Sequence, residues 1–262
     1  MKEKVLSLDL ESHDFLYRIQ RDSRIVYVSI LHEDIVPPDC RTDSFRILAH
    51  LRAVPKWDQD WTTLTVRKGS HGIESTLNEF TPHAMDLKTF NVPLDAIYLN
   101  ILDLTQVTRI SDRVSQVRYG DDMWVLKIAR FAHEVPALTR EVSIYSLLAS
   151  YHFPFAPKFI GFAYEEEARD RTVGFLMEDL SGGRTPDIKD LDACRKTVHT
   201  LHGLGIVHGD LNRHNFLMAA GDAKVFDFEA ASTPAEFELL AAEEEMRSLP
   251  GKLQDESGVG RR

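Results

Sequence analysis

The first hundred residues consist of short apolar, β-rich runs interrupted by polar turns. Two of these runs, Phe15–Gln20 and Arg24–Leu31, are separated by three polar residues and predict a β-hairpin. A helix is expected at Ser44–Arg52 and a further short strand at Leu64–Arg67. Residues 1–100 are therefore expected to form a β-rich N-terminal extension.

Residues 101–262 follow a different order, in which short strands are interspersed with longer segments of helical periodicity. In Pro136–Ser150, for example, Val142, Tyr145 and Leu148 recur on one face, which predicts a helix. Strands and helices in this mixture predict an α+β fold. The other elements expected here are strands at Val107–Ile110, Gln116–Tyr119, Met123–Ala129, Lys158–Ala163 and Arg171–Met177, and a helix at Asp190–Leu204.

The end of the chain predicts one last helix, at Pro234–Leu249. It follows Thr233-Pro234-Ala235-Glu236, which has the spacing of a capping box with proline at the first helical position. Phe237, Leu240 and Ala241 are expected to face inward. The acidic run Glu243-Glu244-Glu245 is expected to form a solvated face.

Charge narrows the possible functions. The 262 residues include 31 Lys+Arg against 41 Asp+Glu, a net charge of −10. Such a balance offers no basic field for phosphate backbones, so nucleic-acid binding and binding to anionic membranes are not expected. No apolar run has membrane-spanning length and the N-terminus lacks the apolar region of a signal peptide, so an intracellular, cytoplasmic location is expected. Cys40 and Cys194 stand alone and suggest neither a disulfide framework nor a cysteine-based zinc site.

Three oxygen-bearing side chains follow one another near the end of the chain. Asp210 is followed five residues later by Asn215 and, after twelve more, by Asp227, each beside apolar, strand-like residues. Oxygen ligands suit magnesium, so Asn215 and Asp227 are expected to hold that ion while Asp210 stays free to accept a proton. The competing interpretation is that all three are Asx residues that cap their own loops.

At this point the sequence resembles the protein kinase superfamily. His208-Gly209-Asp210 followed by Asn215 is similar to the catalytic-loop pattern HRDxxxxN, and Asp227-Phe228-Glu229 is similar to the metal motif DFG. Val125-Leu126-Lys127-Ile128 looks like the lysine motif of the third strand, and Glu141 is placed to be the ion-pair partner of Lys127. Met177 stands at the position of the gatekeeper residue, before a segment similar to the family's hinge.

The resemblance implies an ATP- and Mg²⁺-dependent phosphotransferase. ATP would be positioned by Lys127, and its γ-phosphate would pass to a hydroxyl of a protein Ser/Thr or of a small molecule, whose proton goes to Asp210. It also implies a kinase-like two-lobed fold in which 101–179 form the N-lobe and 180–262 a short C-lobe. The residues implied to contact the nucleotide are Lys127, Glu141, Val117, Met177, Glu178 and Leu180.

Departures from the family pattern support an alternative. Ile110–Ser115 replaces the glycine-rich phosphate loop, Gly209 replaces the arginine of HRD, and Glu229 replaces the glycine of DFG. The C-terminal lobe is abbreviated and lacks a peptide-docking platform, a combination similar to compact kinase-like proteins of fungal type. The alternative is a weak or inactive pseudokinase that acts as a nucleotide-binding or protein-interaction module.

Overall fold

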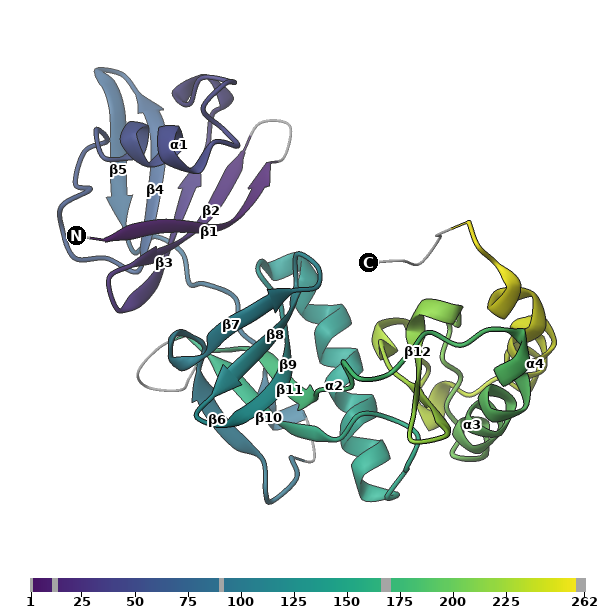
Figure 1. The fold of residues 1–262 in the computed structure, drawn as a ribbon. Helices are drawn as coiled ribbons and strands as arrows, with labels where there is room; N and C mark the ends of the chain where they lie inside the picture. The colour runs from purple at the N-terminus through teal and green to yellow at the C-terminus, as the bar shows by residue number, and fades with distance from the viewer. Residues whose placement is uncertain (1, 11–13, 90–91, 166–170, 258–262) are drawn as a thin grey trace. The chain divides into compact units, whose positions relative to one another are not determined.

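The computed structural model describes residues 2–10, 14–89, 92–165 and 171–257, and its fold is α+β (Figure 1). The chain divides into two compact units. Unit 1 comprises Met1–Ala84, Arg130–Ala132 and Glu165–Arg171, and unit 2 comprises Met85–Ala129, His133–Tyr164 and Thr172–Arg262. The boundary therefore falls at Ala84 rather than at the expected residue 100, because the strand that ends at residue 100 belongs to the sheet of unit 2.

Unit 1 is built on a five-stranded sheet in which neighbouring strands follow one another along the chain. Its strands are β1 (Glu3–Leu10), β2 (Phe15–Arg21), β3 (Arg24–Ile30), β4 (Thr63–Gly69) and β5 (Gly72–Leu77). β3 and β4 pair in parallel, and the other neighbours pair antiparallel. The predicted hairpin of β2 and β3 is confirmed, with Arg21 opposite Arg24.

The predicted helix of unit 1 is also confirmed, as α1 (Ser44–Leu51). It begins at the Asp43 carboxylate, which accepts hydrogen bonds from the Phe45 and Arg46 amides at 3.0 Å and so caps the first turn. Its apolar residues join Trp57 and Trp61 in a core on one face of the sheet. Burial of this apolar surface is what holds the helix to the strands.

Unit 2 contains a six-stranded sheet of order β6-β10-β11-β9-β8-β7. These strands are β6 (Ile97–Asn100), β7 (Thr105–Arg109), β8 (Val114–Tyr119), β9 (Asp122–Ile128), β10 (Phe159–Tyr164) and β11 (Thr172–Glu178). β6 pairs in parallel with β10, and the other neighbours pair antiparallel. The five strands predicted in this region are confirmed, with ends that differ by a few residues.

The helices of unit 2 are α2 (Val135–Ser150), α3 (Leu191–Gly203) and α4 (Leu239–Gln254), with a small hairpin of β12 (Phe216–Ala219) and β13 (Asp222–Val225). A single buried cluster runs from the sheet through α2 to α3 and α4, and Tyr145 and Phe175 lie within it. Figure 1 shows α2 beside the six-stranded sheet. Short 3₁₀ turns connect the elements: η1 (Glu33–Ile35), η2 (Leu87–Thr89), η3 (Ile101–Asp103), η4 (Ala132–Glu134), η5 (Ile188–Asp190), η6 (Arg213–Asn215), η7 (Phe228–Ala230) and η8 (Pro234–Glu236). Among the described residues no helix combines the length and the apolar character that crossing a bilayer requires.

The prediction for the last helix was partly wrong. The capping box of Thr233 and Glu236 is present, but it closes only the 3₁₀ turn η8, and α4 begins at Leu239. The helix therefore has a different register: Leu240 is 79% exposed, whereas Glu245 is only 8% exposed. The buried positions of α4 are Ala242, Glu245, Leu249 and Leu253, which recur at helical spacing on one face.

Candidate functional site

Unit 2 contains a cavity of about 530 Å³. Strands β7, β8, β9 and β11 contribute to its walls, as do the segment after β11, η6, β12 and the residue before η7. Val114, Val125, Met177 and Leu217 supply apolar surface, and Lys127 lies at the polar part. Seven residues expected from the sequence line this cavity: Lys127, Glu141, Met177, Glu178, Leu180, Asn215 and Asp227.

Val117, which was expected to contact the nucleotide, does not line the cavity. Its side chain is 2% exposed and packs with Leu126, Ala163 and Leu176 in a separate cluster. Successive residues of a strand point to opposite faces of the sheet, so Val114 on β8 reaches the cavity and Val117, three positions later, does not. Val117 therefore lies on the face of β8 opposite to the cavity.

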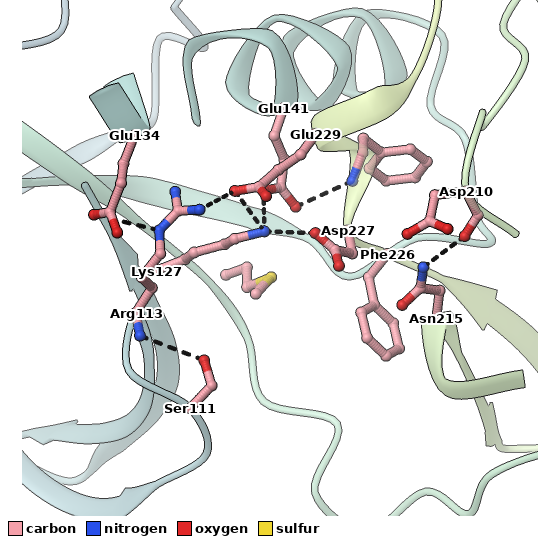
Figure 2. A network of polar contacts seen from close by, with 12 residues as sticks. Ser111, Arg113, Lys127, Glu134, Glu141, Asp210, Asn215, Phe226, Asp227 and Glu229 are labelled. Atoms are coloured by element: carbon pink, nitrogen blue, oxygen red, sulfur yellow. Dashed lines mark hydrogen bonds and ion pairs between the residues drawn. The ribbon is translucent and has the colours of Figure 1, made fainter. Parts of the chain in front are cut away.

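Lys127 is the centre of the polar part of the site (Figure 2). Its Nζ atom lies 2.6 Å from Glu141 Oε2, 2.6 Å from Asp227 Oδ1 and 3.1 Å from Glu229 Oε1. The predicted ion pair with Glu141 is confirmed, and it joins β9 to α2. Both residues are almost fully buried, with Lys127 3% and Glu141 0% exposed.

Burial and charge act in opposite directions on Lys127. Desolvation alone lowers the pKa of the ammonium group, but the carboxylates of Glu141, Asp227 and Glu229 outweigh it and raise that pKa above its usual value. Lys127 therefore stays charged. Burial also raises the pKa of Glu141, and Lys127 offsets this only in part because two further carboxylates crowd it. The carboxylates of Asp227 and Glu229 thus oppose the ionisation of Glu141.

Asp227 adopts a left-handed backbone conformation, with φ 70° and ψ 61°. For a residue other than glycine this conformation costs about 1–2 kcal/mol, so its surroundings must hold it there. Phe228, fully buried, packs its ring 5.3 Å from those of Tyr145 and His208, and its amide donates to Glu141 Oε1 at 3.3 Å. These contacts direct the Asp227 carboxylate to Lys127.

The segment from Asp210 to Asn215 lies beside Asp227 (Figure 2). Asn215 donates from Nδ2 to the Asp210 carbonyl at 2.8 Å, which closes the loop and leaves the amide oxygen of Asn215 as a possible ligand. Asp210 is exposed and is not part of the cavity wall. His208 is fully buried beneath the loop and contacts the Phe226 carbonyl through Nε2 at 3.0 Å, and burial lowers its pKa. The sequence motif is therefore a compact loop with one exposed carboxylate.

The position of residue 209 in the loop requires a glycine. Its φ is +82°, and an added Cβ would lie 2.4 Å from the Ala230 carbonyl oxygen. A side chain at residue 209 would therefore push the loop away from the segment that follows Asp227. The glycine of the His-Gly-Asp sequence allows the two segments to pack closely.

Glu245 on α4 is a site residue that the sequence analysis missed. Its carboxylate accepts from the His208 amide at 3.1 Å and the Gly209 amide at 2.8 Å, and it contacts His202 Nε2 at 2.7 Å. Burial alone raises the pKa of Glu245, but His202 and the two amides outweigh it and lower that pKa. The helical spacing of the buried positions of α4 could have indicated that Glu245 faces inward. It did not, because the helix was predicted to begin at Pro234, with Glu245 on a solvated face.

Arg113 and Glu229 form a second unexpected contact. Arg113 lies in the turn between β7 and β8, and its Nη1 atom is 2.9 Å from Glu229 Oε1 and its Nε atom 3.6 Å from Glu134. Arg113 Nε also donates to the Ile128 carbonyl at 3.0 Å. Arg113 therefore connects the β7–β8 turn, which contains no glycine, to η4 and η7.

Metal ligands are available in this cluster. Carboxylate oxygens of Glu141, Asp227 and Glu229 lie within 4.8 Å of one another. Lys127 and Arg113 contact these carboxylates, and Arg113 also contacts Glu134. Carboxylate oxygens suit a divalent cation, and Asp227 with Asn215 remains the expected pair of protein ligands.

No model of a protein family matches the chain, and a search of curated proteins finds no match.

Proposed function

We propose that the chain is an ATP- and Mg²⁺-dependent phosphotransferase of the protein kinase-like superfamily. The observation that carries this proposal is the contact of Lys127 with both Glu141 and Asp227. These residues come from β9, α2 and the segment before η7, and they meet at a cavity of about 530 Å³ with Asn215 in its wall. A buried lysine held between two carboxylates at a cavity is suited to bind the phosphates of a nucleotide.

The cavity has the composition that a nucleotide requires. Small-molecule sites are mostly apolar clefts of about 300–1,000 Å³ with a few placed polar groups. Val114, Val125, Met177 and Leu217 offer apolar surface to a flat base, and the backbone of Glu178–Leu180 follows β11 along the wall. Lys127 then lies within reach of the phosphates.

Each polar residue has a role in the proposed reaction. Asn215 and Asp227 would hold magnesium, which neutralises phosphate charge when bound. Lys127 would orient the phosphates, and Glu141 holds Lys127 in place. The acceptor oxygen bonds to the γ-phosphorus as the bond from that phosphorus to the β,γ-bridging oxygen breaks. Asp210, exposed beside the cavity, would take the proton of the acceptor hydroxyl, and ADP leaves.

The order of elements supports the kinase-like part of the proposal. A sheet of β7, β8, β9, β10 and β11 with α2 between β9 and β10 is followed by α3, the Asp210 loop and the β12–β13 hairpin. In this interpretation 101–179 form an N-lobe and 180–262 an abbreviated C-lobe. The acceptor is a hydroxyl of a protein Ser/Thr or of a small molecule.

Two observations favour a second candidate, a nucleotide-binding module without transfer activity. Lys127 contacts three carboxylates, because Glu229 adds a third to those of Glu141 and Asp227. The turn that contains Arg113 has no glycine. Both features weaken phosphate binding relative to a lysine with fewer acidic neighbours.

Asp210→Asn separates the two candidates. General-base assistance contributes about 10²–10⁴-fold, so ADP formation from Mg-ATP should fall by that order while ATP affinity changes little. Asp192→Asn, at an exposed carboxylate on α3, is the control and should behave as the unmodified chain. Equal rates of ADP formation would remove Asp210 from the mechanism. ATP binding without ADP formation in any form would favour the non-catalytic module.

A further inference from the structure

One carboxylate oxygen lies between the two cations of the site. Glu229 Oε1 is 3.1 Å from Lys127 Nζ and 2.9 Å from Arg113 Nη1 (Figure 2). Glu229 therefore joins a lysine of the sheet to an arginine of the β7–β8 turn through a single atom. Its side chain is 12% exposed and that of Arg113 is 17% exposed, so the contact is largely shielded from water.

Two cations on one oxygen are also the arrangement that binds a phosphate group. Charge-assisted bonds from lysine and arginine to phosphate oxygens are among the strongest hydrogen bonds in proteins, and arginine donates two parallel ones. Arg113 has donor capacity to spare, because its Nη2 atom is buried and lacks a hydrogen-bond partner within the described part of the chain. A phosphate in place of the Glu229 carboxylate would satisfy the same donors.

Arg113 is close enough to the cavity for this exchange. Lys127 and Ser111 both line the cavity, and the Arg113 amide donates to Ser111 Oγ at 3.4 Å. The side chain of Arg113 then runs from this turn to Glu229. Lys127 Nζ and Arg113 Nη1 contact the same Glu229 oxygen, so an anion bound at Lys127 lies near the Arg113 guanidinium.

We propose that Lys127 and Arg113 form an anion site for a phosphate group and that Glu229 occupies it when no ligand is bound. Arg113 then takes the part that glycine amides would otherwise play in holding phosphates, and Glu229 competes with the ligand and lowers its affinity. This inference rests on the proposed function for its ligand, the polyphosphate end of a nucleoside triphosphate.

A purely structural role for Glu229 predicts the opposite result. If Glu229 only ties the β7–β8 turn to η7, its removal loosens the turn and weakens the binding of any anion. If Glu229 competes, its removal leaves both cations available and strengthens anion binding, although the ligand-free protein loses stability in either case. The direction of the affinity change therefore separates the two roles.

The test uses inorganic tripolyphosphate with a metal chelator present, so that no magnesium site contributes. Calorimetric titration should show Glu229→Gln binding tripolyphosphate about tenfold more tightly than the unmodified chain, the change expected from one charge-assisted contact. Glu229→Asp, which withdraws the carboxylate by one methylene, should change affinity in the same direction. Arg113→Gln should bind about tenfold more weakly. Asp112→Asn, which removes a carboxylate from the same turn, is the control for overall charge and should stay close to the unmodified chain.

The same titrations with ATP and with adenosine distinguish failure of this inference from failure of the proposed function. Unchanged or weaker tripolyphosphate binding in both Glu229 variants overturns the inference, even if ATP still binds and reacts. Tripolyphosphate binding that depends on Glu229 and Arg113 supports the anion site, even if ATP binds no better than tripolyphosphate and the nucleotide proposal fails. Absence of tripolyphosphate binding in all forms overturns the inference.

Discussion

Lys127 contacts the carboxylates of Glu141, Asp227 and Glu229, so its removal tests both binding and stability. Lys127→Met keeps the packing of the side-chain stem and removes only the charge. We expect ATP affinity to fall at least about tenfold. The free energy of unfolding should fall by about 3–5 kcal/mol, because the fully buried Glu141 loses the cation that contacts it. Titration calorimetry and urea unfolding measure the two effects.

The stability part of this prediction depends on pH. The pKa of Glu141 is raised by burial, so this carboxyl takes up a proton in the folded protein at a pH where the unfolded chain is still ionised. Lowering the pH therefore relieves the repulsion in Lys127→Met, and its deficit should be smaller at pH 5 than at pH 8. Lys158→Met, at an exposed lysine, should show neither loss. A deficit that does not change with pH would contradict the account given for Glu141.

Asp227→Asn tests the expected magnesium ligand. Asparagine tolerates the left-handed conformation that Asp227 adopts, so the substitution removes charge without adding backbone strain. In thermal-shift titrations with ATP, the extra stabilisation caused by magnesium should disappear. For the unmodified chain ATP at 100 times its Kd should add about 2.7 kcal/mol. Glu178→Gln, at a cavity carboxylate away from Lys127, should retain the magnesium response. An unchanged response in Asp227→Asn would place the ion elsewhere.

Individual residues could be predicted where a motif fixes both type and spacing. Lys127, Glu141, Asn215 and Asp227 were found in this way, and the cavity brings them together. Val117 does not line the cavity, because one position along a strand reverses the side chain and a motif does not fix which face a residue takes. The contact of Glu229 with Lys127 was not predicted, since it depends on how η7 packs against the sheet.

At the scale of elements, α4 positions the Asp210 loop through one side chain. In the native chain the Glu245 carboxylate contacts three N–H groups. Glu245→Gln replaces it with an amide, whose NH₂ group would face these donors. We expect a loss of about 1–3 kcal/mol in the free energy of unfolding and a lower kcat for ADP formation with little change in ATP affinity. Glu244→Gln, at the exposed neighbour that pairs with Arg247, is the matched control. Equal kcat in both variants would contradict a positioning role for Glu245.

The pH dependence of this contribution has a definite sign. The pKa of Glu245 is lower in the folded protein than its ordinary value, so its stabilisation is present above the unfolded pKa of about 4.3. The stabilisation is lost as pH falls through the folded pKa. Urea unfolding at pH 7 and at pH 3.5 should therefore show the difference between Glu245→Gln and the unmodified chain narrowing at the lower pH.

The elements themselves followed from local patterns, and the exceptions have a local cause. Periodicity located α2 and α3 because their apolar faces are continuous, and the strands because turn residues separate them. The start of α4 was misplaced because a capping box at Thr233 is an equally good start for a single 3₁₀ turn. The longer helix packs against α3, a contact that the local sequence pattern does not show.

At the scale of the whole molecule, the sequence did not predict which segments of the chain make up unit 1. Glu165–Arg171 follows β10 of unit 2, yet it belongs to unit 1. Glu165, completely buried, accepts from Arg18 Nε at 2.8 Å and from the Tyr27 hydroxyl at 2.8 Å, and lies 2.7 Å from Arg171 Nη2. Contacts across such sequence separations leave no periodic signal, because each partner looks locally like a solvated charge.

This buried group leads to a prediction for unit 1 as a whole. Burial alone raises the pKa of Glu165, but Arg18 and Arg171 outweigh it and lower that pKa, so its stabilisation is present at neutral pH and lost on acidification. Glu165→Gln removes the carboxylate that contacts both buried arginines, which should cost about 3–5 kcal/mol at pH 7. In a Trp124→Phe background, which removes the tryptophan of unit 2, fluorescence of Trp57 and Trp61 in the core of unit 1 reports its unfolding in urea.

We expect Glu165→Gln to move this fluorescence transition to lower urea concentration. The stabilisation by Mg-ATP should persist, because the cavity lies within unit 2. Asp34→Asn removes an exposed carboxylate of unit 1 that pairs with Lys68, and it should leave the transition almost unchanged. If Glu165→Gln also abolished the response to Mg-ATP, the two units could not be treated as separately stabilised bodies. An unmoved transition would instead show that the buried arginines find other counter-charges.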